Sequence, residues 1–278
     1  MNTENQDPVE QINIKEMFLK KNPKLAKRIP GFVYRYLTRI MHIDEINEIL
    51  INHGNERGIE FARSMVKHFN VHETIIGAEN IPASGRFIFA SNHPLGGFDA
   101  FLILCNIDRI LGETITLVND VLMSIPQLAP IFVPLNKHGG LGKEVIQQIH
   151  DAYVSDKQIL IFPSGFASRK INGKIQDFVW KKHFIAKSIE YQRDVIPVHV
   201  SGKNSNFFYR LANFRTFFRL KWNLEMFYLA DETFSHKNQK FTITFGKPIP
   251  FTHFDKSKTL DQWAQEVKDI AYRLPNQT

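Results

Sequence analysis

A histidine stands at the end of a short hydrophobic run, six residues before an aspartate. Residues 86–99 have the sequence RFIFASNHPLGGFD, in which His93 follows a predicted strand and Asp99 opens a predicted apolar helix. Asp99 could hold one imidazole nitrogen of His93 while the other nitrogen takes a proton from a hydroxyl group. Pro94 disfavours helical backbone at the residue before it, so the His93 side chain can project from the strand end. The alternative is a plain loop histidine and an aspartate that only caps the helix.

A second predicted strand ends in hydroxyl groups and cations. Residues 159–170 have the sequence ILIFPSGFASRK, which closes on Arg169 and Lys170. Backbone N–H groups at such a turn could receive a developing oxyanion, with the region near Gly165 as the candidate, and the two cations could bind a phosphate or a carboxylate. A strand followed by a solvated basic loop is the alternative.

Two further strand-end segments are weaker candidates for a functional site, and a metal site is not supported. Residues 131–140 (IFVPLNKHGG) end in Lys137 and a glycine pair, and residues 195–202 (VIPVHVSG) carry a proline inside a strand. A metal site could be drawn only from scattered histidines, whose spacing matches no known ligand pattern. We therefore expect neither a metal nor a tightly bound cofactor. The scattered histidines are His93, His138 and His199.

The spacing of apolar residues predicts the elements that carry these side chains. Helical periodicity fills most of residues 12–69, and short β-rich runs alternate with helices after residue 72. The predicted strands are 72–77, 86–91, 114–118, 131–135, 159–163, 195–200, 225–230 and 241–246. The predicted helices of this part are 98–111, 141–155, 178–192 and 259–273. Alternation of this kind predicts an α/β fold with a mixed, mostly parallel sheet flanked by helices, joined to an N-terminal helical subdomain.

Composition and charge narrow the class of protein. The predicted organisation is a disordered tail over residues 1–10, the helical subdomain over 11–70 and the α/β domain over 71–278. The net charge of +7 favours anionic partners such as membrane lipid, nucleic acid or a phosphorylated substrate. The one cysteine, Cys105, sits in an apolar run, so we expect a buried thiol and a reducing cytosolic environment. The polar N-terminus is no secretory signal, and no apolar run reaches the length of a membrane span, so any membrane contact should be peripheral.

The ordered set of motifs resembles the glycerolipid acyltransferases of the lysophosphatidate type. The set is Asn-His with a following Asp, a strand with a basic end, Phe-Pro-x-Gly-x-x-Ser and Val-Ile-Pro-Val, and it spans about residues 77–250. The closest likeness is to acyltransferases of Bacteroidota that share Asn-His-Pro-Leu-Gly-Gly, some of which act on amino-acid lipids. This resemblance implies a lipid hydroxyl acceptor, an acyl thioester donor (acyl-CoA or acyl carrier protein) and work at a membrane surface. It also implies that His93 is the general base, that Asp99 orients it, and that Pro197 lies near the acyl or acceptor pocket.

The resemblance further implies a head-group site that departs from the family pattern. Five residues, rather than four, separate His93 from Asp99, and the usual glutamate and arginine of the third motif are Ser164 and Ala167. A carboxylate-bearing acceptor, such as an N-acylated amino acid with a free hydroxyl group, is at least as well supported as lysophosphatidate. The predicted substrate-binding residues are Asn92, Gly96, Gly97, Lys137, Phe162, Pro163, Ser164, Gly165, Ser168, Arg169 and Lys170.

Residues 207–222 combine seven aromatic side chains with four cations. Phe207, Leu211, Phe214 and Phe218 share one face if the segment is helical, which suits the interface of an anionic bilayer. An ordinary amphipathic helix packed on the sheet is the alternative. We predict membrane contacts, and with them a peripheral position on the inner face of the cell membrane. The predicted contact residues are Phe207, Arg210, Phe214, Arg215, Phe218 and Arg219.

Three other functions compete with acyl transfer to a lipid. A basic protein that binds nucleic acid without catalysis is disfavoured because the cations are spread along the chain and no binding motif is present. A hydrolase would activate water with the same histidine, and the residues do not separate the two. A degenerate acyltransferase kept as a binding module would not need His93 and Asp99 together. Membrane lipids are the expected partners, acyl carrier protein is a possible one, and nucleic acid is not expected; the sequence leaves the oligomeric state open.

Overall fold

A computed structural model describes residues 11–118, 123, 125–135, 142–219 and 223–276. The predicted disordered tail over residues 1–10 and the predicted substrate-binding Lys137 lie outside the described residues, as does His138. Across the described ranges, no helix combines the length and the apolar character that crossing a membrane requires.

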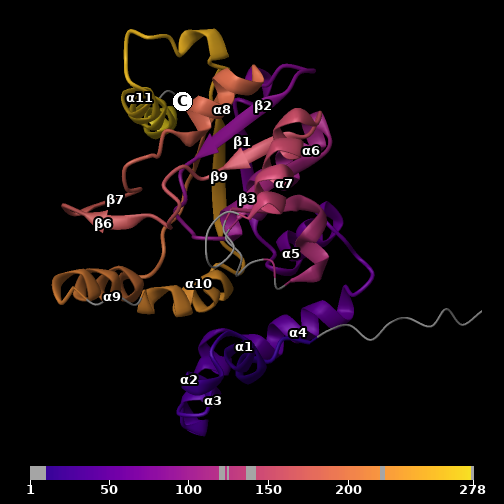
Figure 1. Cartoon of the computed structure of the whole chain (residues 1–278), viewed down its shortest axis with the longest axis vertical. Helices are drawn as coiled ribbons and strands as arrows, with labels where there is room; N and C mark the ends of the chain where they lie inside the picture. The colour runs from indigo at the N-terminus through magenta and orange to yellow at the C-terminus, as the bar shows by residue number, and fades with distance from the viewer. Residues whose placement is uncertain (1–10, 119–122, 124, 136–141, 220–222, 277–278) are drawn as a thin grey trace, which may run out of the picture.

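A seven-stranded sheet forms the centre of the molecule (Figure 1), with the strand order β1-β9-β8-β2-β5-β3-β4. Neighbouring strands run parallel except for β8 and β9, which are antiparallel. The prediction of a mixed, mostly parallel sheet is therefore confirmed. The strands are β1 (His72–Ile76), β2 (Phe87–Ser91), β3 (Thr114–Val118), β4 (Phe132–Pro134), β5 (Gln158–Ile161), β8 (Asp194–Val200) and β9 (Lys240–Phe245).

Helices cover both faces of the sheet because its strands are apolar on both sides. On one face, α5 (Ile59–His68) and α6 (Phe98–Leu111) share a core with side chains such as Phe89 and Ile196. On the other, α7 (Lys143–Val154), α8 (His183–Tyr191) and α11 (Leu260–Arg273) surround Ile88 and Val195. Strands buried on both faces are typical of parallel sheets. The central strand β2, which carries His93 at its end, lies between β5 and β8.

The N-terminal helices divide between two clusters of buried side chains. Helices α1 (Ile14–Lys21), α2 (Pro23–Ala26) and α3 (Gly31–Ile40) lie away from the sheet, at the bottom of Figure 1, around a small core of Ile14, Tyr34 and Ile43. Helix α4 (Ile43–Asn52) begins at that small core, and its later residues Ile49 and Leu50 join the main core with α5. The predicted helical character of residues 12–69 is confirmed.

The segment 225–230, predicted as a strand, is helical. The 3-10 helix η4 (Leu224–Tyr228) runs into α10 (Leu229–Ser235), after α9 (Asn206–Phe217). A short apolar run has no period of its own that separates strand from helix, and here the burial of Glu225 decides the geometry. Helix α8 also begins at His183, later than predicted, because the preceding residues pass through an extended segment that buries Trp180.

A two-stranded hairpin, β6 (Arg169–Ile171) and β7 (Lys174–Gln176), was not predicted. Its turn residues Asn172 and Gly173 have φ of 50° and 80°, the left-handed pair that a tight hairpin turn requires. Figure 1 shows the hairpin standing out from the sheet on the side of α9. Three single-turn 3-10 helices, η1 (Ala78–Asn80), η5 (Phe251–His253) and η6 (Leu274–Asn276), and the longer η3 (Pro126–Ile131) complete the described elements.

Candidate active site

His93 and Asp99 are in contact. The Nδ1 atom of His93 lies 3.0 Å from Oδ2 of Asp99, although the two residues belong to a strand end and a helix start. The Asp99 side chain is fully buried, and the His93 side chain keeps 16% of its surface exposed. No hydrogen-bond partner is recorded for His93 Nε2 among the described residues. The sequence prediction that the two side chains meet, with the imidazole still accessible, is therefore met by the geometry.

Asp99 is fixed by the backbone of its own loop. Its Oδ2 accepts from the N–H of Leu95 at 3.0 Å, and its Oδ1 accepts from the N–H of Gly97 at 3.1 Å. Burial alone would raise the pKa of Asp99, but the His93 ring and these N–H groups hold it below its usual value. An ionised Asp99 can only accept at His93 Nδ1, so that nitrogen carries the proton and Nε2 offers a lone pair.

The pKa of His93 is raised above its ordinary value of 6.5. Burial lowers it, but the negative charge and hydrogen bond of Asp99 raise it by more, and the charge of Asp177 adds to that effect. A raised pKa makes the neutral imidazole a stronger base, which suits it to taking a proton from a hydroxyl group.

The loop between β2 and α6 needs only one of its two glycines for backbone conformation. Gly96 has φ of 79°, and a Cβ atom there would lie 2.7 Å from Leu229 and 2.9 Å from Ala167. Gly97 has an extended φ of 166°, and a Cβ atom on it would meet nothing within 4 Å. The loop is thus held closely between α10 and the segment that leads into β6.

The Phe162–Ser168 segment packs beside His93. The Phe162 ring stacks on the imidazole with centroids 4.0 Å apart. The Gly165 N–H donates to the Phe162 carbonyl at 2.9 Å and the Ser164 hydroxyl to the Phe166 carbonyl at 2.7 Å, so both groups serve the turn itself. The Gly165 N–H is thus engaged within the turn, and the expectation that backbone donors near Gly165 receive an oxyanion stays a prediction. Pro163 is buried within the same turn.

A second buried carboxylate, which sequence reasoning missed, holds the His93 backbone. Asp177 Oδ1 accepts from the His93 N–H at 3.2 Å and from the Ser168 hydroxyl at 2.6 Å, and Oδ2 accepts from Trp180 Nε1 at 2.9 Å. The Ser168 N–H also donates to the His93 carbonyl at 2.8 Å. Burial raises the pKa of Asp177 above its usual value. The sequence signal was a lone acid just after the Asn-Gly hairpin, 84 residues from His93.

Two of the predicted site residues lie where β2 and β8 pair with each other. Asn92 is buried, and its side chain donates to the Val200 carbonyl at 2.9 Å and accepts from the Val200 N–H at 2.7 Å. Pro197 pairs with Ala90 in the register of β2 and β8 and is buried inside the sheet. The first of these contacts ties the end of β8 to the residue before His93.

The adjacent cations Arg169 and Lys170 have different surroundings. Arg169 is 4% exposed, donates to buried Glu225 at 3.0 Å and lies over the Phe208 ring at 4.9 Å, whereas Lys170 is exposed. Burial lowers the pKa of Arg169, and Glu225 opposes that shift. Arg169 Nε is buried with no hydrogen-bond partner among the described residues.

The predicted membrane residues of α9 are exposed, with one exception. Phe207, Phe214, Phe218, Arg210 and Arg219 are all exposed, while Phe208, Tyr209 and Ala212 form the buried face. Arg215 instead donates from Nε to both carboxylate oxygens of Glu225, at 3.0 and 3.2 Å. Its charge is therefore engaged inside the protein together with Arg169.

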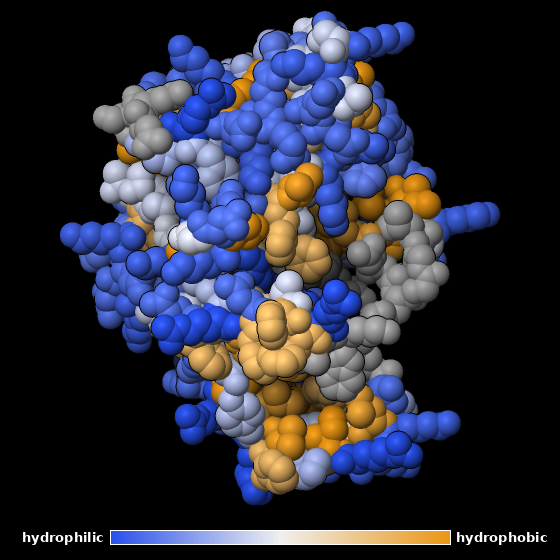
Figure 2. All heavy atoms as spheres, turned by 90° about the vertical axis from the view of Figure 1, so that its left-hand side faces the viewer, coloured by the Kyte–Doolittle hydropathy of each residue, from blue (hydrophilic) through white to orange (hydrophobic). Residues whose placement is uncertain are grey.

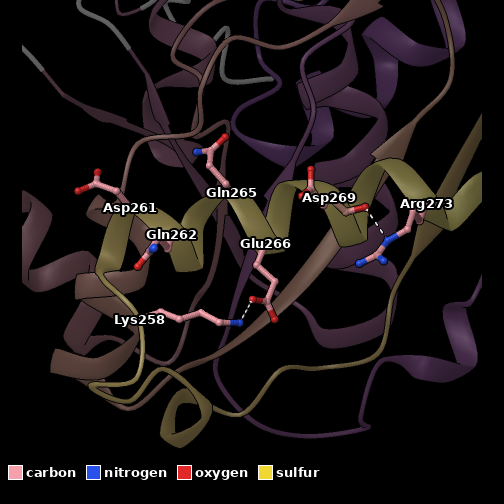
Figure 3. A pocket seen from close by; sticks show the side chains of 7 residues that line it. All are labelled: Lys258, Asp261, Gln262, Gln265, Glu266, Asp269 and Arg273. Atoms are coloured by element: carbon pink, nitrogen blue, oxygen red, sulfur yellow. Dashed lines mark hydrogen bonds and ion pairs between the residues drawn. The ribbon is translucent and has the colours of Figure 1, made fainter.

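A groove of 510 Å³ lies elsewhere, along the exposed side of α11 (Figure 3). All of its lining residues come from this helix and the turn before it, and Lys258 and Glu266 form an ion pair across it. None of the predicted site residues lines it. Within the described ranges, no group of three or more His, Cys, Asp or Glu side chains is arranged to hold a metal ion.

Comparisons with known proteins agree with one another. Residues 16–278 match the model of a family described as acyltransferase. Two proteins named lyso-glycine lipid O-acyltransferase are similar over nearly their full lengths. The one from Bacteroides thetaiotaomicron is 45% identical over 264 residues, covering 95% of this chain and 97% of that protein. The one from Phocaeicola vulgatus is 42% identical over 273 residues, covering 96% of each.

The chain is also similar to solved structures, among them the 1-acyl-sn-glycerophosphate acyltransferase PlsC from Thermotoga maritima. The alignment covers 87% of this chain and 95% of that one, with a TM-score of 0.48 and 17% sequence identity. Because this TM-score is below 0.5, the assignment of the fold rests on the strands and helices described above.

Proposed function

The chain belongs to the acyltransferase family, and we propose that it transfers a fatty acyl group from an acyl thioester to the hydroxyl group of an amino-acid lipid such as a lyso-glycine lipid. Two relatives that carry this name, similar over nearly the whole chain, support the acceptor. A lipid attached through the amine of glycine keeps its carboxylate, which agrees with a head-group motif that departs from the phosphate-binding pattern. A lysophospholipid is the alternative acceptor.

The observation that carries the mechanism is the Nδ1 contact of His93 with a buried carboxylate while Nε2 has no recorded partner in the described part of the chain. His93 Nε2 removes the proton of the acceptor hydroxyl group as its oxygen attacks the thioester carbonyl carbon. The new C–O bond forms, the C–S bond breaks, and the thiolate leaves with the proton that His93 received. Asp99 stabilises the imidazolium between these steps, and Asp177 positions the backbone of His93.

No enzyme nucleophile is required because a thioester is already activated. Cys105 is buried in α6, as expected, and burial raises the pKa of its thiol to about 12, so it stays protonated and inert at neutral pH. Either acyl-CoA or an acyl carrier protein would serve as donor and co-substrate. We place the enzyme in the cytoplasm, peripherally on the inner face of the cell membrane.

The direct test uses purified protein with radiolabelled acyl-CoA or acyl carrier protein and a lyso-glycine lipid. We expect the labelled diacylated lipid as product, and loss of about 10²–10⁴-fold in rate for His93→Ala, the usual contribution of a general base. His150→Ala, on α7 and hydrogen-bonded to Tyr191, is the matched control and should keep the parent rate. Labelled free fatty acid as the sole product would identify a hydrolase, and normal transfer by His93→Ala would exclude the mechanism.

A further inference from the structure

Large aromatic side chains are exposed on two helices that are far apart in the sequence. Phe207, Phe214, Phe217 and Phe218 of α9 and its C-terminal cap are 52%, 54%, 81% and 55% exposed. Phe32 and Tyr36 of α3 are 65% and 47% exposed. Figure 2 views the molecule from the left-hand side of Figure 1. It shows apolar side chains gathered over the lower half of that side, where α9 and the N-terminal helices lie. Contiguous apolar surface of this kind marks an interaction site.

Specific contacts join the two helices into one surface. The Tyr36 hydroxyl of α3 lies 2.5 Å from the Tyr228 hydroxyl at the end of η4, and the Tyr228 ring lies edge-on to Phe207 of α9 at 4.9 Å. Behind them, His42 Nε2 lies 3.0 Å from the Asp231 carboxylate of α10, and the His42 ring stacks on Phe234 with centroids 4.2 Å apart. The exposed aromatics of α3 and α9 therefore belong to one continuous platform.

Positive charge is concentrated on the N-terminal helices α1–α3 and on α9. Residues 14–42 hold eight Lys or Arg residues against the single acid Glu16, a net charge of +7 that equals the net charge of the whole chain. Residues 206–219 contain Arg210, Arg215 and Arg219 and no acid. The remaining residues hold 24 cations and 27 acids, a net charge of −3. Cations therefore occur along the whole chain, but the net positive charge comes from these two segments.

We propose that α3 and α9 together form a docking surface for an anionic lipid bilayer; this deepens, and rests on, the function proposed above. Aromatic side chains that project from a cationic face are the combination that enters the interface of anionic bilayers. An acidic protein would satisfy the cations but would leave the exposed phenylalanines unexplained. Arg215 is not part of this surface, because Glu225 already engages it.

The surface lies next to the catalytic loop. Phe208, on the buried side of α9, packs under the Arg169 guanidinium, and the preceding Ser168 donates its N–H to the His93 carbonyl. Leu229, at the start of α10, packs against Gly96. A bilayer bound to α9 would therefore bring acceptor lipid to the side of the molecule on which His93 lies.

Co-sedimentation with vesicles tests the proposal. The probe is vesicles of phosphatidylcholine with or without phosphatidylglycerol, and the protein is the full chain carrying His93→Ala, so that turnover plays no part. We expect binding that requires phosphatidylglycerol and weakens with salt. Phe214→Ser with Phe217→Ser should weaken binding about tenfold or more, and Arg35→Glu with Arg39→Glu, which reverses the two exposed cations of α3, about 100-fold.

Matched controls come from the opposite surfaces. Ile146→Ser with Val154→Ser removes side chains of α7 that are 52% and 51% exposed, and Lys247→Glu with Lys256→Glu reverses exposed charges near α11. These variants should bind vesicles as the parent does, and circular dichroism should show every variant folded. Two results would overturn the proposal. One is equal vesicle binding by the α9 variant and the control variants. The other is that the α3 and α9 variants bind vesicles as the parent does but lose binding to an acyl carrier protein. Vesicle binding without acyl transfer by the parent enzyme would refute the proposed function and leave the docking surface standing.

Discussion

Buried carboxylates hold His93 at both its side chain and its backbone. Asp99 contacts Nδ1 at 3.0 Å, and Asp177 accepts from the backbone N–H at 3.2 Å. The first contact could be predicted because one short loop joins His93, just after a strand, to Asp99, in the first turn of the next helix. The second could not, because it depends on how a hairpin 84 residues away folds back over the sheet end.

The raised pKa of His93 predicts how the rate depends on pH. The neutral imidazole is the active base, so kcat/KM should fall as the pH drops through a pKa above 6.5, where His93 becomes protonated. Asp99→Asn removes the charge that raises this pKa, and burial then lowers it, so the profile should shift to lower pH. The maximal rate should also fall, by about 10²–10⁴-fold, because Asn no longer favours the tautomer with a free Nε2.

Measuring kcat/KM of both enzymes from about pH 5 to pH 9 checks this prediction, because histidines titrate within this range. Asp269→Asn, an exposed carboxylate on α11, is the control and should leave the profile in place. An Asp99→Asn enzyme with the parent profile would show that another group sets the pH dependence.

At the scale of elements, the strands and helices around the site followed from hydrophobic periodicity. The predicted bounds of helix 98–111 and strand 114–118 agree with α6 and β3, because long apolar helices and buried strands have clear patterns. Elements held by polar contacts were missed or misassigned. Segment 225–230 is helical because Glu225 is drawn inward by Arg169 and Arg215, an arrangement that no local pattern encodes. The hairpin β6–β7 had a readable signal in Asn172-Gly173, but its strands are too short and polar to show alternation.

The loop between β2 and α6 gives a prediction that separates its two glycines. Gly96→Ala introduces a side chain at φ of 79°, 2.7 Å from Leu229 and 2.9 Å from Ala167, so the loop must move and carry Asp99 with it. We expect kcat to fall about 10²-fold, as expected when a catalytic pair is displaced by about 1 Å. Gly97→Ala, where a Cβ atom meets open space, should retain most of the rate. Assays of the two purified variants side by side check this, and equal losses would contradict it.

At the scale of the whole molecule, packing and charge divide the chain at a similar place. The small core of Ile14, Tyr34 and Ile43 is separate from the main core, while α5 is built into the main core through Phe61 and Ala62. The net charge of +7 in residues 14–42 can be read along the chain, but the surface that these residues share with α9 depends on which helices pack together. The predicted boundary at residue 70 stays a prediction, and the packing of the buried residues favours a division nearer α4.

This division predicts that α1–α3 open locally while the α/β core stays folded. Tyr34 is 9% exposed, and its hydroxyl donates to the Ala26 carbonyl at 2.9 Å, so Tyr34→Ala should loosen only the small cluster. Phe61 is 2% exposed and packs in the main core, so Phe61→Ala should destabilise the whole protein by about 3–5 kcal/mol. Hydrogen exchange followed by mass spectrometry distinguishes the two. We expect Tyr34→Ala to speed exchange in α1–α3 and to leave β2 and β8 protected, whereas Phe61→Ala speeds exchange in both strands. Faster exchange in β2 with Tyr34→Ala would mean that the N-terminal helices and the sheet unfold as one unit.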